Sequence, residues 1–204
     1  MGIDEESVIA SRRKFLKKLA YGSVLALSGC GIETAPFRDE SRQVISQQSH
    51  IRYCCSPEYR TLSFEYTHTG EKLKLAYFER GNYIKGALQE INYLLRDFRT
   101  GDVCPIDTAL LDQLFDLKQT LDLNKPFHII SGYRSPFTND SLRKNSHGVA
   151  KHSYHLQGRA IDIRVEGVSS KTVRNTALAM AQGGVGYYPR NNFVHLDSGR
   201  FRAW

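Results

Sequence analysis

The sequence predicts an α+β domain in which two or three helices pack on a small, largely antiparallel sheet. Three observations support this: an alternating hairpin pattern over residues 62–78, helical periodicity in three later segments, and short apolar runs of strand length between them. The chain has 204 residues, of which 41% are apolar and 24% charged. That size and composition fit one globular domain with a sizeable core once a targeting segment is removed.

The first half of the domain is predicted as a hairpin, two helices and a strand. Residues 62–66 and 72–78 alternate between apolar and polar side chains, and Thr67–Gly70 supplies the turn between them. Apolar residues recur at helical spacing over 83–99, and again through residue 121 after Asp107, which can cap that helix. Residues 127–130 then predict a short, buried, central strand.

The second half is predicted as a long polar loop followed by three strands and a helix. The loop covers residues 131–150, and loops of this length in compact domains usually have a function. We expect strands at 160–165, 184–187 and 193–196, and a helix at 169–182, from the same periodicity rules.

The N-terminus has the features of an export signal rather than of a folded segment. Arg12 and Arg13 lie in a seven-residue stretch that resembles the twin-arginine motif, and a short apolar run follows. Residues 27–30 resemble a bacterial lipobox, in which Cys30 would be lipidated and tether the protein to the membrane; the alternative is a plain cleaved signal. We therefore predict a signal segment at 1–30, a flexible lead-in at 31–59 and a folded domain at 60–204 that acts outside the cytoplasm, in the periplasm.

The net charge restricts the class of binding partner, and the cysteine spacing restricts metal binding and disulfide pairing. The net charge is +7, but no dense Lys/Arg cluster lies beyond the N-terminal segment, which argues against nucleic acid and fits carboxylate-rich cell-wall peptide. Adjacent Cys54 and Cys55 lack zinc-finger spacing. Cys104 could pair with either of them in an oxidising compartment, and three reduced cysteines are equally compatible with the sequence.

Two histidines and an aspartate give the chain its clearest chemical signal. His155 and Asp162 lie on either side of Gly158, where a turn could bring both side chains to one point, and His195 comes from a later strand. Three protein ligands on zinc leave the fourth position to water, as in catalytic sites. Period-two alternation places Asp197 on the same face as His195.

The combined pattern resembles the M15 class of zinc peptidases. It consists of Ser-x-His-x2-Gly-x-Ala-x-Asp over residues 153–162 and Phe-Val-His-Leu-Asp over 193–197. The segments 131–139 and 183–189, with the closing Trp204, narrow the resemblance to the DUF882 branch of murein endopeptidases. The resemblance covers residues 60–204. It implies an M15/Hedgehog-like fold, one Zn²⁺ per chain held by His155, Asp162 and His195, and peptidoglycan stem peptides as substrate.

The resemblance also implies an activity and roles for further residues. The implied reaction is cleavage between two meso-diaminopimelate residues of cross-linked stem peptides. Arg134 would orient a substrate carbonyl or carboxylate, because a guanidinium can hold either through paired hydrogen bonds. Asn139 and Tyr187 are further candidates for substrate contact.

The sequence does not determine which residue is the general base, because the two positions that supply it in other M15 peptidases hold Asn192 and Phe193 here. Alternation favours Asp197 as the base, with His152 second. A role for Asp197 in orienting His195 is an equal alternative.

Two other functions remain compatible with the sequence. One keeps the fold and the metal but cuts D-Ala bonds, as a D,D-carboxypeptidase or D,D-endopeptidase. The other is a zinc-containing cell-wall-binding module without catalysis, suggested by Asn192 at a place where a catalytic glutamate stands in some relatives.

Overall fold

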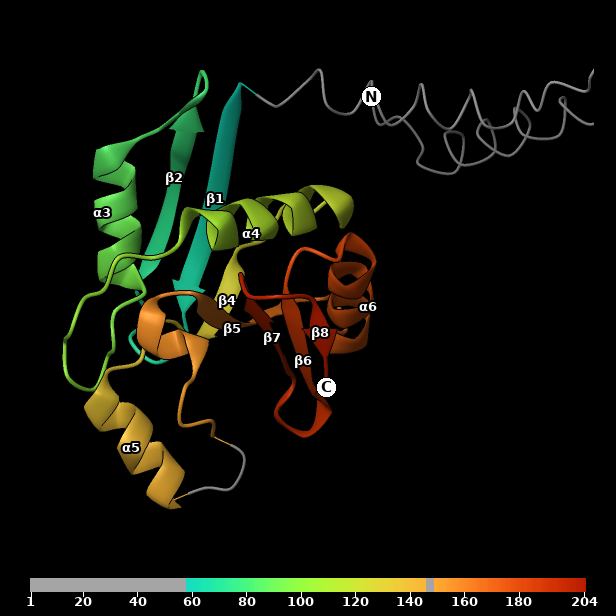
Figure 1. Cartoon of the computed structure of the whole chain (residues 1–204). Coiled ribbons are helices and arrows are strands. Elements are labelled where there is room, and N and C mark those ends of the chain that lie inside the picture. The colour runs from blue at the N-terminus through green and yellow to red at the C-terminus, as the bar shows by residue number, and fades with distance from the viewer. Residues whose placement is uncertain (1–57, 146–148) are drawn as a thin grey trace, which may run out of the picture. The chain divides into compact units, whose positions relative to one another are not determined.

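The computed structural model describes residues 58–145 and 149–204, and in this part of the chain all strands join one sheet (Figure 1). Its eight strands are ordered β3-β2-β1-β4-β5-β7-β6-β8. The predicted signal segment with Cys30, most of the lead-in, and Cys54 and Cys55 lie outside the described residues. The strands are β1 Tyr59–Tyr66, β2 Lys72–Glu79, β3 Asn82–Tyr83, β4 Phe127–Ser131, β5 Ala160–Val165, β6 Gly184–Tyr188, β7 Phe193–Asp197 and β8 Arg202–Ala203.

The sheet is larger than the sequence predicted. The two-residue strands β3 and β8 extend it at its edges, and neither is long enough to produce a periodic pattern in the sequence. Pairing is antiparallel except between β1 and β4 and between β6 and β8, so the largely antiparallel prediction is confirmed. The predicted central strand, β4, is fourth in the order.

Four α-helices accompany the sheet within the described residues: α3 Lys85–Leu94, α4 Thr108–Thr120, α5 Pro136–Asn145 and α6 Ser170–Met180. In Figure 1, α3 lies beside β2, α4 crosses near β1, and α6 packs on β6, while α5 projects away from the sheet. The predicted cap is confirmed, because the Asp107 carboxylate accepts a hydrogen bond of 3.0 Å from the Ala109 N–H. None of the described helices has the length and apolar character needed to cross a membrane.

The first predicted helix, 83–99, extends two residues too far at its start and five too far at its end. Helix α3 ends at Leu94, where Leu95 leaves helical geometry and its carbonyl accepts a 2.8 Å hydrogen bond from the Tyr133 N–H. Leu95 is nevertheless 1% exposed. The apolar pattern therefore continues beyond the helix, because Leu95 is buried by tertiary contacts. One of these is with Gly132, which follows β4 and at which a side chain would collide with the Leu95 carbonyl oxygen.

The predicted loop at 131–150 is wrong over half its length, because α5 occupies residues 136–145. Pro136 suits the first helical position, where its missing N–H is not needed. The buried side chains of α5, Thr138 and Asn139, are both polar. A helix that buries no apolar stripe has no hydrophobic period for sequence reasoning to detect.

Cross-strand register divides the central sheet into a core face and a polar face. Residues paired across strands point to the same side, and successive residues alternate. Ile163 and Val194 form one pair on the core face, whereas Asp162 pairs with His195 on the other. Gly186 pairs with His195 in turn. The polar face at this point is the place where the predicted ligands meet.

Candidate metal centre

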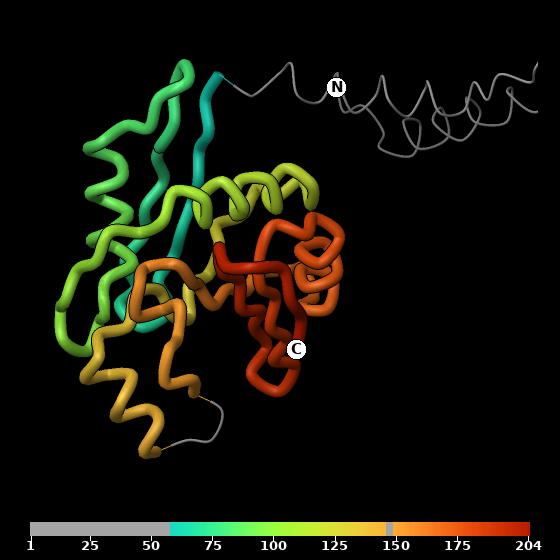
Figure 2. The backbone as a smooth tube through the Cα atoms, in the orientation of Figure 1, coloured from blue at the N-terminus to red at the C-terminus, as the bar shows by residue number. Residues whose placement is uncertain are grey.

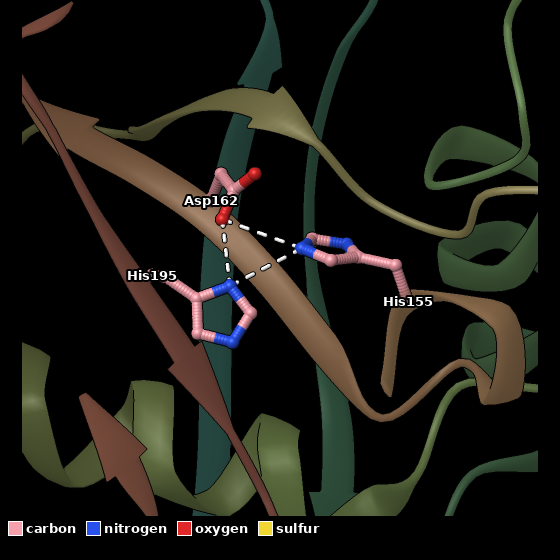
Figure 3. A group of neighbouring side chains, drawn as sticks. All are labelled: His155, Asp162 and His195. Carbon is pink, nitrogen blue, oxygen red and sulfur yellow. Dashed lines mark hydrogen bonds and ion pairs between the residues drawn. The ribbon is translucent and has the colours of Figure 1, made fainter. Parts of the chain in front are cut away.

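Three side chains from three elements converge on the polar face, as Figure 3 shows. His155 comes from the 3-10 turn Tyr154–Gln157, Asp162 from β5 and His195 from β7. Asp162 Oδ1 lies 2.9 Å from His195 Nδ1 and 3.3 Å from His155 Nε2, and the two ring nitrogens are 3.2 Å apart. All three residues are buried.

Gly158 makes the turn that brings His155 to Asp162. Its φ of +66° is in the left-handed region, and a side chain on it would collide with the Pro105 carbonyl oxygen. Both observations call for glycine. Ser153 caps the 3-10 turn through its hydroxyl, which accepts a hydrogen bond from the His155 N–H at 3.4 Å.

Each histidine is anchored through the ring nitrogen that faces away from the cluster. His155 Nδ1 lies 2.7 Å from the Gly132 carbonyl oxygen, and a carbonyl only accepts, so the proton sits on Nδ1. His195 Nε2 lies 3.0 Å from Asp197 Oδ2, so the same reasoning gives it a proton there. The inward nitrogens are then the ones left to bind a metal ion, as in metal-bound histidines.

Asp197 is fully buried and accepts five hydrogen bonds. Its Oδ1 takes the N–H groups of Gly184 at 3.3 Å and Gly199 at 2.9 Å together with Arg202 Nη1 at 2.9 Å. Its Oδ2 takes Arg202 Nη2 at 2.7 Å in addition to His195 Nε2. A carboxylate with all its acceptor sites occupied, on the outer side of the His195 ring, favours the orienting alternative over that of a general base.

Arg202 was not identified from the sequence. A buried carboxylate needs a positively charged partner, but the chain has many arginines and their spacing does not indicate which of them pairs with Asp197. The selection is made by β8, which runs parallel to β6 and brings Arg202 beside Asp197. Figure 2 shows the C-terminal segment, in red, returning to this edge of the sheet.

The glycine-rich segment 183–186 makes room for these contacts. A side chain on Gly184 would collide with Arg202 Nη1 and Asp197 Oδ2. One on Gly186 would lie 2.8 Å from ring carbons of Trp204. The Trp204 ring is 5.3 Å from that of His195, so Gly186 permits an aromatic wall beside the cluster.

Tyr187 does not line that wall. It pairs with Val194 on the core face, and Arg174 of α6 lies over its ring at 4.8 Å. Its predicted contact with substrate stays a prediction. The neighbouring Tyr188 is on the polar face, accepts a 2.9 Å hydrogen bond from Trp204 Nε1, and stacks on Phe193 with 4.5 Å between ring centres.

Arg134 lies beside the cluster with weakly satisfied donors. Its Nη2 is 3.9 Å from Asp162 Oδ2 and 3.4 Å from Ser131 Oγ, and its Nη1 is 3.5 Å from Asn139 Oδ1. Burial lowers the pKa of this guanidinium, although Asp162 opposes the shift. Asn139 is 2% exposed, and its Nδ2 donates a hydrogen bond to the Ala150 carbonyl oxygen at 3.3 Å. Its side chain therefore contacts Arg134 and the backbone at Ala150 rather than solvent.

The electrostatics of the cluster suit a cation. Burial lowers the pKa of His155, which keeps its ring neutral. Burial would raise the pKa of Asp162, but the two histidines outweigh it and hold that carboxyl ionised. Burial would also lower the pKa of His195, yet hydrogen bonds to Asp162 and Asp197 raise it to about 8, so a metal ion that binds near neutral pH has to displace the proton on Nδ1.

The donor set therefore fits a metal ion. The three inward ligand atoms lie within 4.8 Å of one another, and their nitrogen and carboxylate oxygen chemistry is that of zinc sites. Both outer anchors are in place, so ring orientation does not depend on the metal. Sequence reasoning named all three residues, and the structure brings all three together.

Comparison with known proteins identifies relatives along most of the chain. Residues 54–204 match the peptidase M15 family described as peptidoglycan L,D-endopeptidase MepK. The MepK protein of Escherichia coli strain K12 is 46% identical over 149 residues, which cover 73% of this chain and 82% of that protein. A probable MepK of Haemophilus influenzae is 40% identical over 161 residues, covering 78% and 87%. The chain therefore belongs to this M15 peptidase family, and it is a peptidase.

Proposed function

We propose that the protein is a zinc-dependent endopeptidase that cleaves meso-diaminopimelate–meso-diaminopimelate cross-links in peptidoglycan. The observation that carries the proposal is the buried His155–Asp162–His195 cluster with both outer ring nitrogens anchored. The relatives are described as peptidoglycan L,D-endopeptidases, which supports the choice of L,D cross-links over D-Ala bonds. Asn192, at a place where some relatives have a catalytic glutamate, is the observation in favour of the non-catalytic alternative.

His155, Asp162 and His195 would hold the ion. When bound in such a set, zinc supplies Lewis acidity that activates water and polarises the scissile carbonyl. Gly132 and Asp197 keep the two rings in the tautomers that binding requires. Arg134 has spare donor capacity beside Asp162, and it would hold a substrate carboxylate or the oxyanion that develops during peptide cleavage.

Asp197 acts in this proposal as a positioning residue for His195. Its five hydrogen bonds leave it no free acceptor, and although its burial would raise its pKa, these bonds hold that pKa below the usual range. The proton acceptor is then assigned to His152, the other candidate named by the sequence. His152 is exposed in the turn three residues before His155.

The place of action follows from the sequence at the N-terminus. We propose export by the twin-arginine route, with Cys30 as a possible lipid anchor, because Arg12 and Arg13 stand in a matching motif before an apolar run. Replacing both arginines with lysine should leave the precursor in the cytoplasm. Unchanged export of that variant would refute the route.

The function is tested on purified sacculi with the zinc-loaded full chain. We expect loss of diaminopimelate-linked dimers in a chromatographic muropeptide profile, and no loss with the His155→Ala variant, which should also lose zinc. Loss of D-Ala-linked dimers instead would favour the D,D-specific alternative. An unchanged profile with zinc bound would favour the wall-binding module.

A further inference from the structure

A second polar row crosses the sheet next to the row that holds the metal cluster. Arg164 lies two residues along β5 from Asp162, which puts it on the same face at a distance of about 7 Å along the strand. His128 of β4 pairs with Arg164. Phe193, two residues before His195 on β7, lies on this face as well.

Arg164 is half-buried, and its guanidinium makes no hydrogen bond or ion pair to any residue that the structure describes. Other arginines near the site differ in this respect: Arg202 is bound to Asp197 and Arg159 to Ser198. An arginine carries five donors and a permanent charge. One held on a sheet without a partner retains the capacity to bind an anion.

Two carboxylates near Arg164 are paired with lysines. Glu166 accepts from Lys125 Nζ at 3.0 Å, and Glu65, which pairs with His128, lies 3.1 Å from Lys72 Nζ. Asp162, on the same face, is engaged by His155 and His195 in the metal cluster. Arg164 faces an open groove of about 420 Å³, whose lining includes His128, Arg164, Ser169 and Asn192.

From this arrangement we propose that Arg164 and His128 form a carboxylate-binding subsite that holds a free carboxylate of a diaminopimelate residue in the stem peptide. The inference rests on the proposed function. Two residues of extended peptide span about 7 Å, so a chain whose scissile bond lies at Asp162 can place a neighbouring carboxylate at Arg164. A guanidinium fork matches the two oxygens of a carboxylate, and the imidazole adds one further hydrogen bond.

Equilibrium binding tests the subsite independently of catalysis. The probe is a stem tripeptide of L-Ala, D-Glu and meso-diaminopimelate, used with free carboxylates and with the diaminopimelate carboxylates amidated. Calorimetric titration into the zinc-loaded full chain should show that the free form binds about 10- to 100-fold more tightly, as expected for a charge-assisted pair. Arg164→Gln should remove that preference, and Arg164→Lys should retain part of it.

Lys171→Gln is the matched control, because it removes an exposed positive charge from α6 and should leave the preference intact. Zinc content and thermal melting establish that each variant is folded, and the Arg164→Lys comparison decides the matter if Arg164→Gln does not fold. Equal binding of the two tripeptides by the unmodified chain would overturn the subsite. So would a preference that survives in both Arg164 variants.

Failure of the proposed function would look different. If the chain leaves sacculi intact but still prefers the free tripeptide through Arg164, the subsite stands and the endopeptidase proposal falls. If the chain cleaves diaminopimelate-linked dimers with the same KM for free and amidated forms, the endopeptidase stands and the subsite falls.

Discussion

Replacing Asp197 with asparagine separates the two roles that this residue could have. The carboxylate accepts five hydrogen bonds, three on Oδ1 and two on Oδ2. An amide has one oxygen, which accepts, and one NH₂ group, which only donates. If the NH₂ group takes the place of Oδ1, three donors lose their acceptor, and if it takes the place of Oδ2, two donors lose theirs. The less costly orientation turns the NH₂ toward Arg202 Nη2 and His195 Nε2, and it therefore removes the anchor of the ligand histidine.

The magnitude follows from these contacts. A buried donor left without its acceptor costs about 1–3 kcal/mol, so a loss of a few kcal/mol in the free energy of unfolding is expected. Loss of an outer anchor on a ligand histidine lowers metal affinity by about 10- to 100-fold. Activity per zinc-loaded molecule should fall much less, because at saturating zinc the same three ligands hold the ion.

The assay uses a property of the sequence. Trp204 is the single tryptophan of the chain, and its ring lies 5.3 Å from that of His195, so its fluorescence should report zinc binding. Zinc titrations against a competing chelator give the affinity, and cleavage of L,D-linked dimers at saturating zinc gives kcat. Asp122→Asn, an exposed aspartate after α4, is the control.

The opposite pattern would refute the reasoning. A general base contributes about 10²–10⁴-fold to the rate. If Asp197→Asn binds zinc as tightly as the unmodified chain and loses kcat by that factor at saturating zinc, Asp197 is the base and the orienting role is wrong. An unchanged zinc affinity with unchanged kcat would exclude both roles.

Three further outcomes are expected. Gly186→Ala should displace the Trp204 ring, since the added carbon would lie 2.8 Å from it, and the shift should appear in the tryptophan emission spectrum with a raised KM; an unchanged spectrum would contradict the packing. Arg134→Gln should lower kcat by about 10²–10³-fold, as for loss of an oxyanion donor, with zinc content unchanged; normal kcat would remove Arg134 from the reaction. Asp97 is buried, and burial would raise its pKa, but hydrogen bonds from Ser135 and from the Arg99 N–H outweigh that and lower it. Its stabilising effect is therefore present above the unfolded-state pKa of about 4 and is lost as pH falls through the folded value. The gap in unfolding free energy between the unmodified chain and Asp97→Asn should therefore be full at pH 7 and narrow below about pH 4 in denaturant titrations, and a gap that widens in acid would contradict this sign.

Local patterns predicted most of the regular elements. The β1–β2 hairpin, α4 with its Asp107 cap, and strands β4 to β7 each have a period or turn that a short window of sequence contains. One error lies where no such period exists, and the other lies where the period continues beyond the end of the helix. Helix α5 buries polar side chains only, and the apolar stripe after Leu94 is buried by contact with a distant loop.

The residues able to serve as metal ligands can be identified from the sequence, because the residue types, their spacing around Gly158 and the alternation in β7 are all local. What those residues do together depends on the tertiary fold. Register placed Tyr188 rather than Tyr187 on the polar face, since one residue changes the side of a strand. The parallel pairing of β8 with β6 gave Asp197 its cation. Such long-range pairings depend on the closure of the whole sheet, and no segment of the sequence contains them.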